Sequence, residues 1–371
     1  MINQERLVNT FIDLAKLDSE SKFERKVADY TKAKLEKLGF TVREDEAGEK
    51  IGGNAGNIIG YHPGDGQGKS LLFCAHMDTV KPAIGVKPEI RDGYIYSGGD
   101  TILGGDDKAG IAAVLEAIET AQENNIPCGP IQVVFTIAEE IGLFGAKHLE
   151  VEKMQPVDAA FSFDSDGVPS EICIAAPHHI AFTVTFTGKA SHAGVEPEKG
   201  INAIYIMAEA INNMKLGRID EETTANFGII NGGRATNVVT ETVTVWGEAR
   251  SLNREKIEAQ IAHMTKCCED AAAKFGGKAE VITEEEYSAI NLDKDSLTVQ
   301  MACQAAEKMG LTPNLVKSGG GTDANVFCGK GIPACNIGVG MENVHSLDER
   351  LSIENMAMAT RVILELIKAA K

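Results

Sequence analysis

Short apolar runs that stop at acidic or imidazole side chains recur three times in the first half of the chain. A continuous apolar run of this length predicts a buried strand of a parallel sheet. The runs and the polar residues after them are LLFC (71–74) before His76 and Asp78, IQVVFTI (131–137) before Glu139 and Glu140, and AAFSF (159–163) before Asp164. Because functional side chains gather beyond the carboxyl ends of strands in open α/β sheets, the three runs together predict one site.

Amphipathic helical segments alternate with these strands. The apolar spacing predicts helices over residues 2–17, 22–38, 254–275, 295–310 and 353–371, and another helix that starts at about residue 111. Outside residues 178–288, the alternation of helix and strand is typical of an α/β fold with a mostly parallel sheet and helices on both faces.

The pattern changes after Pro177, where HHIAFTVTFT alternates apolar and polar residues as a half-exposed antiparallel strand does. Helical and strand patterns then follow in the order β-α-β-β-α-β. We therefore expect a catalytic domain made of residues 1–177 and 289–371. Residues 178–288 are expected to form an inserted, ferredoxin-like α+β lid domain.

Length and charge narrow the class of protein. The chain has 371 residues and a formal net charge of −18, which argues against nucleic acid or an anionic membrane as a partner. The N-terminal segment carries acids and lacks the apolar core of a signal peptide, and no run approaches the ~18 apolar residues of a membrane span. Eight scattered cysteines without a CxxC pair favour free thiols in a reducing cytoplasm.

Two further stretches add candidate ligands. Asp106 and Asp107 stand in the glycine-rich stretch SGGDTILGGDDKAG (97–110), directly before a helix, where an aspartate could also serve as a plain cap. His345 lies in ENVHSLDER near the C-terminus. Asp164 is preferred to Asp166 as a ligand because it follows its apolar strand immediately.

The collected side chains suit a binuclear metal site. The five candidate ligands are His76, Asp106, Glu140, Asp164 and His345. Two imidazoles and three carboxylates fit zinc first, with cobalt or manganese as substitutes, and they exceed the needs of one tetrahedral ion. Two ions sharing one carboxylate would activate a bridging water, for which Glu139 is the natural general base, and Asp78 would orient the ring of His76.

Six motifs then point to a known family. AHMDTV, GGDDKAG, AEEIG, FDSDG, SHAG and NVHS occur in this order between residues 75 and 346. With them, nearly the whole chain resembles the di-zinc exopeptidase and acylase family that includes peptidase T, carboxypeptidase G and aminoacylase, most of all its peptidase T-like branch. The resemblance implies two Zn²⁺ per chain, with His76 and Glu140 on different ions, Asp106 as the bridge and Asp164 and His345 completing the two sets.

The resemblance also implies substrate-binding residues in the inserted domain and beside it. His192 resembles the lid histidine that polarises the substrate carbonyl, and Asn237 and Arg250 resemble substrate-binding positions. Gly320 could offer a backbone N–H to a substrate carboxylate. Each of these residues could instead belong to an ordinary surface turn or strand.

The implied activity is that of a cytoplasmic, metal-dependent exopeptidase acting on short peptides. Peptidase T itself is a tripeptide aminopeptidase, so the resemblance to its branch favours this specificity. Because NGGRATNVV (231–239) resembles the acylase and carboxypeptidase members more closely, a carboxypeptidase, a dipeptidase or an N-acyl-amino-acid amidohydrolase stays open. A metal- or peptide-binding protein without turnover is a further alternative, disfavoured by the intact base and ligand set. A dinucleotide-binding oxidoreductase is disfavoured because no GxGxxG follows the first strand. A homodimer formed through the lid domain also stays open.

Overall fold

The computed structural model describes all residues from 1 to 371, and the chain divides into two compact units. The first comprises Met1–Ala175, Ile290–Ser318 and Thr322–Lys371, and the second comprises Ala176–Ala289 with Gly319–Gly321. Each unit has its own hydrophobic core. None of the helices combines the length and the hydropathy needed to span a lipid bilayer.

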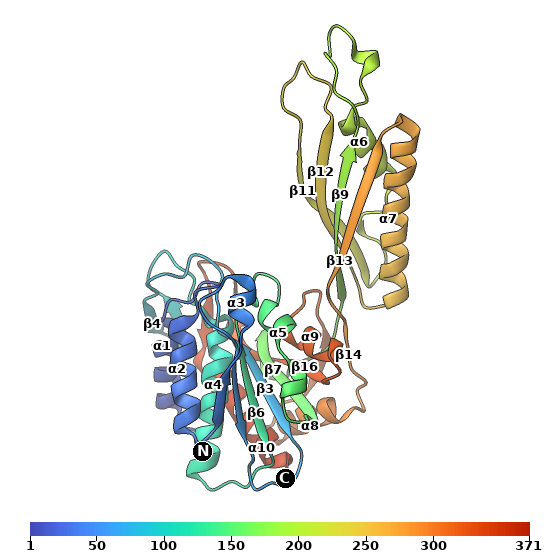
Figure 1. The fold of residues 1–371 in the computed structure, drawn as a ribbon. Helices are drawn as coiled ribbons and strands as arrows, with labels where there is room; N and C mark the ends of the chain where they lie inside the picture. The colour runs from blue at the N-terminus through green and yellow to red at the C-terminus, as the bar shows by residue number, and fades with distance from the viewer. The chain divides into compact units, whose positions relative to one another are not determined.

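The first unit is an α/β structure, as the apolar strand pattern predicts (Figure 1). Its helices are α1 (Gln4–Ala15), α2 (Arg25–Lys37), α3 (Ala47–Ile51), α4 (Gly105–Glu123), α5 (Phe144–His148), α8 (Leu297–Lys308), α9 (Asp323–Gly329) and α10 (Ile353–Ala369), with a 3₁₀ turn at Val151–Lys153. Its strands are β1 (Thr41–Glu44), β2 (Ile58–His62), β3 (Leu71–His76), β4 (Pro88–Arg91), β5 (Tyr94–Ser97), β6 (Ile131–Thr136), β7 (Ala159–Asp166), β8 (Glu171–Ala176), β14 (Ile290–Asn291), β15 (Asn314–Lys317), β16 (Ala334–Glu342) and β17 (Arg350–Ser352).

These strands form one 12-stranded sheet whose main path runs β1-β2-β6-β3-β7-β16-β17-β5-β4. Strands β6, β3, β7 and β16 are mutually parallel neighbours, whereas β2 and β17 join them antiparallel. The parallel core therefore brings the carboxyl ends of four strands to one edge of the sheet. The short strands β4 and β5, which the apolar pattern does not predict, extend the sheet beyond β17.

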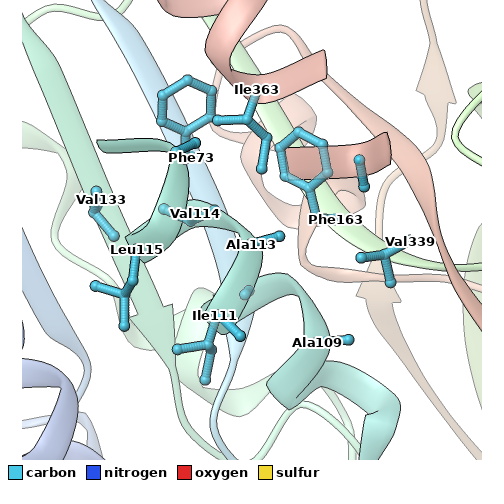
Figure 2. Packing of buried hydrophobic residues seen from close by; sticks show 14 of the residues in the cluster. Phe73, Ala109, Ile111, Ala113, Val114, Leu115, Val133, Phe163, Val339 and Ile363 are labelled. Atoms are coloured by element: carbon cyan, nitrogen blue, oxygen red, sulfur yellow. The ribbon is translucent and has the colours of Figure 1, made fainter. Parts of the chain in front are cut away.

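Helices cover both faces of this sheet. Because strand side chains alternate, Phe73 of β3 points to one face and Cys74 to the other. Figure 2 shows Phe73, Phe163 of β7 and Ile363 of α10 gathered around Val114 of α4, all within one buried cluster. On the opposite face, the Sγ atom of Cys74 lies 3.9 Å from a carboxylate oxygen of Asp323, the first residue of α9. The continuous apolar run of β3 follows from this burial on both sides.

The second unit is a five-stranded antiparallel sheet in the order β10-β11-β12-β9-β13, with two helices. Its elements are β9 (His178–Thr187), a 3₁₀ turn at Pro197–Lys199, α6 (Ala203–Asn213), β10 (Gly217–Arg218), β11 (Thr223–Gly232), β12 (Thr242–Ser251), α7 (Arg254–Phe275) and β13 (Lys278–Tyr287). Phe182, Val184 and Phe186 on one face of β9 are buried in a core with Ile206 of α6 and Met264 of α7. The alternating pattern of β9 thus reflects one covered face, and its intervening residues lie on the other face.

Candidate metal centre

The five predicted ligands all lie in the first unit, beyond the carboxyl ends of its parallel strands. His76 is the last residue of β3, and Asp164 lies near the end of β7. Glu140 follows β6 in a turn, and His345 follows β16. Asp106 stands at the start of α4, where its backbone and that of Asp107 depart from helical angles and their peptide bond is cis.

Asp106 lies between the two histidines. Its Oδ1 atom is 2.9 Å from Nε2 of His76, and its Oδ2 atom is 3.2 Å from Nε2 of His345. The Glu140 carboxylate lies 3.0 Å from the same nitrogen of His345, and Oδ1 of Asp164 lies 3.6 Å from Nε2 of His76. The arrangement resolves into two sets that share Asp106, one with His76 and Asp164 and one with His345 and Glu140.

Asp78 connects the strand of His76 to the turn that carries Glu139 and Glu140. Its Oδ1 atom accepts a hydrogen bond from the Glu139 amide at 2.9 Å, and its Oδ2 atom accepts from the Glu140 amide at 3.3 Å and from the Ser21 hydroxyl at 2.6 Å. The Nδ1 atom of His76 is 2.9 Å from the backbone carbonyl of Asp78 and 3.5 Å from its carboxylate. The closer partner of the ring is therefore the main chain of Asp78, while the carboxylate fixes the backbone of the glutamate turn.

Glu139 is buried, with 9 % of its surface exposed. Burial raises the pKa of its carboxyl well above the usual range, and the charge of Asp164 acts in the same direction. A carboxylate in such surroundings holds a proton more readily than one in water, which is the property a general base near neutral pH requires.

The charges of the five clustered candidate ligands indicate whether the site suits cations. Burial raises the pKa of Asp164 to about 8 and also raises that of Glu140, and the charge of Asp106 acts in the same direction on both carboxyls. Hydrogen bonds to Asp106 and Glu140 raise the pKa of His345 to about 10. Burial disfavours a charged His76, but its hydrogen bonds to Asp106 and Asp164 outweigh burial and raise its pKa well above the usual range. Negative charge dominates the cluster, so divalent cations fit this donor set.

One oxygen or nitrogen atom from each of His76, Asp106 and Glu140 lies within 4.8 Å of the others, a spacing that an ion can occupy. Asp166, the weaker alternative to Asp164, is exposed at the end of β7. The main chain of Asp164 is braced by Asn336 of β16, whose side-chain amide accepts from its N–H at 2.9 Å and donates to its carbonyl at 2.7 Å.

Sequence reasoning missed several buried side chains that support the candidate ligands. They are Glu24, Asn336 and Glu349, which hydrogen-bond to backbone groups of Ala138, Asp164 and Asp106 respectively. Glu24 and Glu349 stand in polar stretches and carry no periodic signal, and only its position four residues after His345 sets Glu349 apart. Asn336 interrupts a buried apolar strand, a signal that sequence reasoning overlooked.

The four predicted substrate-binding residues lie in the second unit. His192 is bridged to Val238, and the amide of Ala193 donates to the carbonyl of Asn237, so the loops of His192 and Asn237 are adjacent. Arg250 of β12 forms two hydrogen bonds of 3.0 Å to the carboxylate of Glu248 and a third of 3.1 Å to the carbonyl of Gly319, next to Gly320.

Comparison with known proteins places the chain in a family. The model of "Peptidase family M20/M25/M40" matches residues 72–369. The uncharacterized protein YqjE of Bacillus subtilis (strain 168) is 44 % identical over 370 residues, which cover 100 % of both chains.

Two solved structures are also similar over their full length. The aminopeptidase PepT from Bacillus cereus ATCC 10987 superimposes with a TM-score of 0.94 at 45 % identity, and a tripeptidase from Staphylococcus aureus subsp. aureus mu50 superimposes with 0.95 at 41 % identity. Each comparison covers 100 % of this chain and 99 % of the other. The chain therefore belongs to peptidase family M20/M25/M40 and to its peptidase T-like branch.

Proposed function

We propose that this peptidase is a metal-dependent aminopeptidase that removes the N-terminal residue of short peptides, tripeptides above all. The position of Asp106, with one carboxylate oxygen toward each histidine, carries the metal-dependent part of the proposal. The choice of an aminopeptidase over a carboxypeptidase or an acylase rests on the likeness to an aminopeptidase and a tripeptidase at more than 40 % identity.

The residues fit two divalent ions, with Zn²⁺ as the first choice and Co²⁺ or Mn²⁺ as substitutes. His76 and Asp164 would hold one ion, Glu140 and His345 the other, and Asp106 would be shared. When bound, such ions act as Lewis acids that polarise a carbonyl and lower the pKa of water.

Glu139 is proposed as the general base. Its carboxylate takes a proton from the attacking water as the new C–O bond forms at the scissile carbonyl. It then delivers this proton to the nitrogen of the leaving amine as the C–N bond breaks. Asp78 keeps the base in place because it accepts a hydrogen bond from the Glu139 amide.

The second unit, whose main segment Ala176–Ala289 contains the predicted lid residues 178–288, is proposed as the lid that recognises the substrate. His192 would donate a hydrogen bond to the substrate carbonyl, and Asn237, Arg250 and Gly320 would bind the remainder of the peptide. A planar guanidinium is suited to a peptide carboxylate because it can donate two parallel hydrogen bonds.

A Glu139→Gln variant tests the mechanism. We expect kcat for a free tripeptide to fall by about 10²- to 10⁴-fold, the usual contribution of a general base, with unchanged metal content. Glu152→Gln is the matched control because Glu152 is exposed on the same unit. Unchanged hydrolysis by the Glu139→Gln protein would refute the assignment of the base.

A substrate panel tests the specificity. Free tripeptides, N-acetylated tripeptides, dipeptides and N-acyl amino acids would be assayed with zinc, cobalt and manganese. We expect cleavage of tripeptides that carry a free amino terminus and little cleavage of their acetylated forms. Preferential cleavage of acetylated peptides or N-acyl amino acids would instead establish the carboxypeptidase or acylase alternative.

A further inference from the structure

Glu349 connects the two loops that carry Asp106 and His345. Its side chain is almost fully buried, with 1 % exposure. The Oε2 atom accepts hydrogen bonds from the amides of Leu103 at 2.7 Å and Gly104 at 2.8 Å, and the Oε1 atom accepts from the amide of Asp106 at 3.1 Å. One carboxylate thus binds three closely spaced main-chain donors, the arrangement by which backbone loops bind anions.

The loop that Glu349 binds has irregular backbone geometry. Gly104 has a φ of 74°, and Asp106 has a ψ of 106°, so neither residue adopts helical angles. These amides precede the first regular turn of α4, where donors have no intrahelical partner. Glu349 supplies the partner, and it thereby fixes the main chain from which Asp106 reaches toward both histidines.

The same residue is tied to the His345 loop. The amide of Glu349 donates to the carbonyl of Ser346 at 3.1 Å, one residue after His345. Strand β17 begins at the next residue, Arg350, and pairs with both β16 and β5. The distance between Asp106 and His345 is therefore set through Glu349 and the sheet together.

We propose that Glu349 is a positioning residue that holds Asp106 in register with His345 and so sets the affinity of the site for its pair of ions. This inference rests on the proposed binuclear function. Because Asp106 is the shared ligand, displacing its loop is expected to weaken the binding of both ions, whereas loss of a ligand to one ion alone would weaken chiefly that ion.

Glu349→Gln is an informative variant because it preserves size but leaves only one acceptor oxygen. If the remaining oxygen faces Leu103 and Gly104, the amide of Asp106 meets an NH₂ group, and the reverse orientation leaves the other two amides unpaired. Glu349→Asp keeps the charge on a shorter side chain. Asp348→Asn is the matched control, since Asp348 is the neighbouring acid and its side chain is exposed.

The experiment measures metal binding directly. Metal-free wild type and the three variants would be titrated with Zn²⁺ against a chromophoric chelator, and with Co²⁺ while its visible absorption spectrum is recorded. We expect about 10- to 100-fold weaker Zn²⁺ binding and an altered Co²⁺ spectrum for Glu349→Gln, an intermediate effect for Glu349→Asp, and wild-type behaviour for Asp348→Asn. The kcat of the Glu349→Gln protein is expected to recover in part as metal is raised, which a loss of folded protein would not produce.

Wild-type Zn²⁺ affinity and Co²⁺ spectrum in folded Glu349→Gln would overturn the positioning role while leaving the proposed function standing. If that variant does not fold, Glu349→Asp decides in the same way. Failure of the wild type and of Asp348→Asn to bind a pair of ions would overturn the proposed function, and this inference with it.

Discussion

The turn that carries the proposed base rests on a buried carboxylate whose second oxygen has no partner. The Oε1 atom of Glu24 accepts hydrogen bonds from the amides of Lys22 at 2.7 Å and Ala138 at 3.1 Å, directly before Glu139. The Oε2 atom is buried without a hydrogen-bond partner. A Glu24→Gln variant can keep both amide bonds through its carbonyl oxygen and remove only the buried charge.

The expected magnitude follows from the pKa of this carboxyl. Burial, with a contribution from the charge of Asp78, raises the pKa of Glu24 from 4.5 to about 7. Each pH unit corresponds to about 1.4 kcal/mol, so the charged form costs the folded protein about 3 kcal/mol above pH 7. The unpaired NH₂ group of glutamine costs about 1–3 kcal/mol in the same place. We therefore expect Glu24→Gln to increase the free energy of unfolding above pH 7 by at most about 2 kcal/mol.

The pH dependence gives the sharper test. Between pH 4.5 and about 7 the folded state binds more protons at Glu24 than the unfolded state does, so the free energy of unfolding falls as pH rises through this window. Glu24→Gln removes this contribution. The difference in the free energy of unfolding, variant minus wild type, should therefore be smallest near pH 4.5, increase up to about pH 7 and stay constant above it.

Urea unfolding at pH 5, 6, 7 and 8 in one metal-supplemented buffer measures this difference, with Glu36→Gln on the exposed side of α2 as the control. Peptidase activity should be retained, because the turn of Glu139 keeps its support. A difference that does not change with pH, or one that falls as pH rises, would show that Glu24 is not a buried charge with an unpaired oxygen.

Three further predictions address the site and the second unit. Asp78→Asn should lower kcat by about 10- to 100-fold, because one of its oxygens becomes a donor facing the turn of Glu139, and steady-state kinetics at saturating metal measures this loss. Arg250→Ala should raise KM for tripeptides by at least about tenfold with a smaller change in kcat, and a selective loss of kcat would contradict a binding role. Mixing inactive His192→Ala and Glu139→Gln chains should restore activity if the histidine acts across subunits of a dimer, whereas no recovery would assign it to its own chain.

Much of the first unit could be predicted from its sequence because the relevant signals are local. Apolar runs identify β3, β6 and β7, and the polar residue that ends each run is the one placed at the sheet edge, as with His76. Asp106 stands at the start of a helix instead of following a strand, and its glycine-rich context singled it out. His345 comes shortly after β16, and the family resemblance then implied which ion each of the two residues would bind.

The residues that hold the ligands in place could not be predicted in this way. Glu349 acts on amides more than 240 positions earlier in the chain, and Glu24 acts on Ala138 across 114 positions. Such pairings depend on the tertiary fold, and neither glutamate differs in sequence from the exposed acids around it. The short strands β4 and β5 escaped prediction for a related reason, since their residues are mostly exposed or half-buried and show no apolar run.

The most direct test of the central claim is the metal content of the purified chain and of an Asp106→Ala variant, measured by mass spectrometry after equilibration with zinc. We expect two zinc ions per wild-type chain, loss of peptidase activity when they are chelated, and a failure of folded Asp106→Ala to retain the pair. Two tightly bound ions in that variant, or full activity of the metal-free wild type, would contradict a binuclear centre bridged by Asp106.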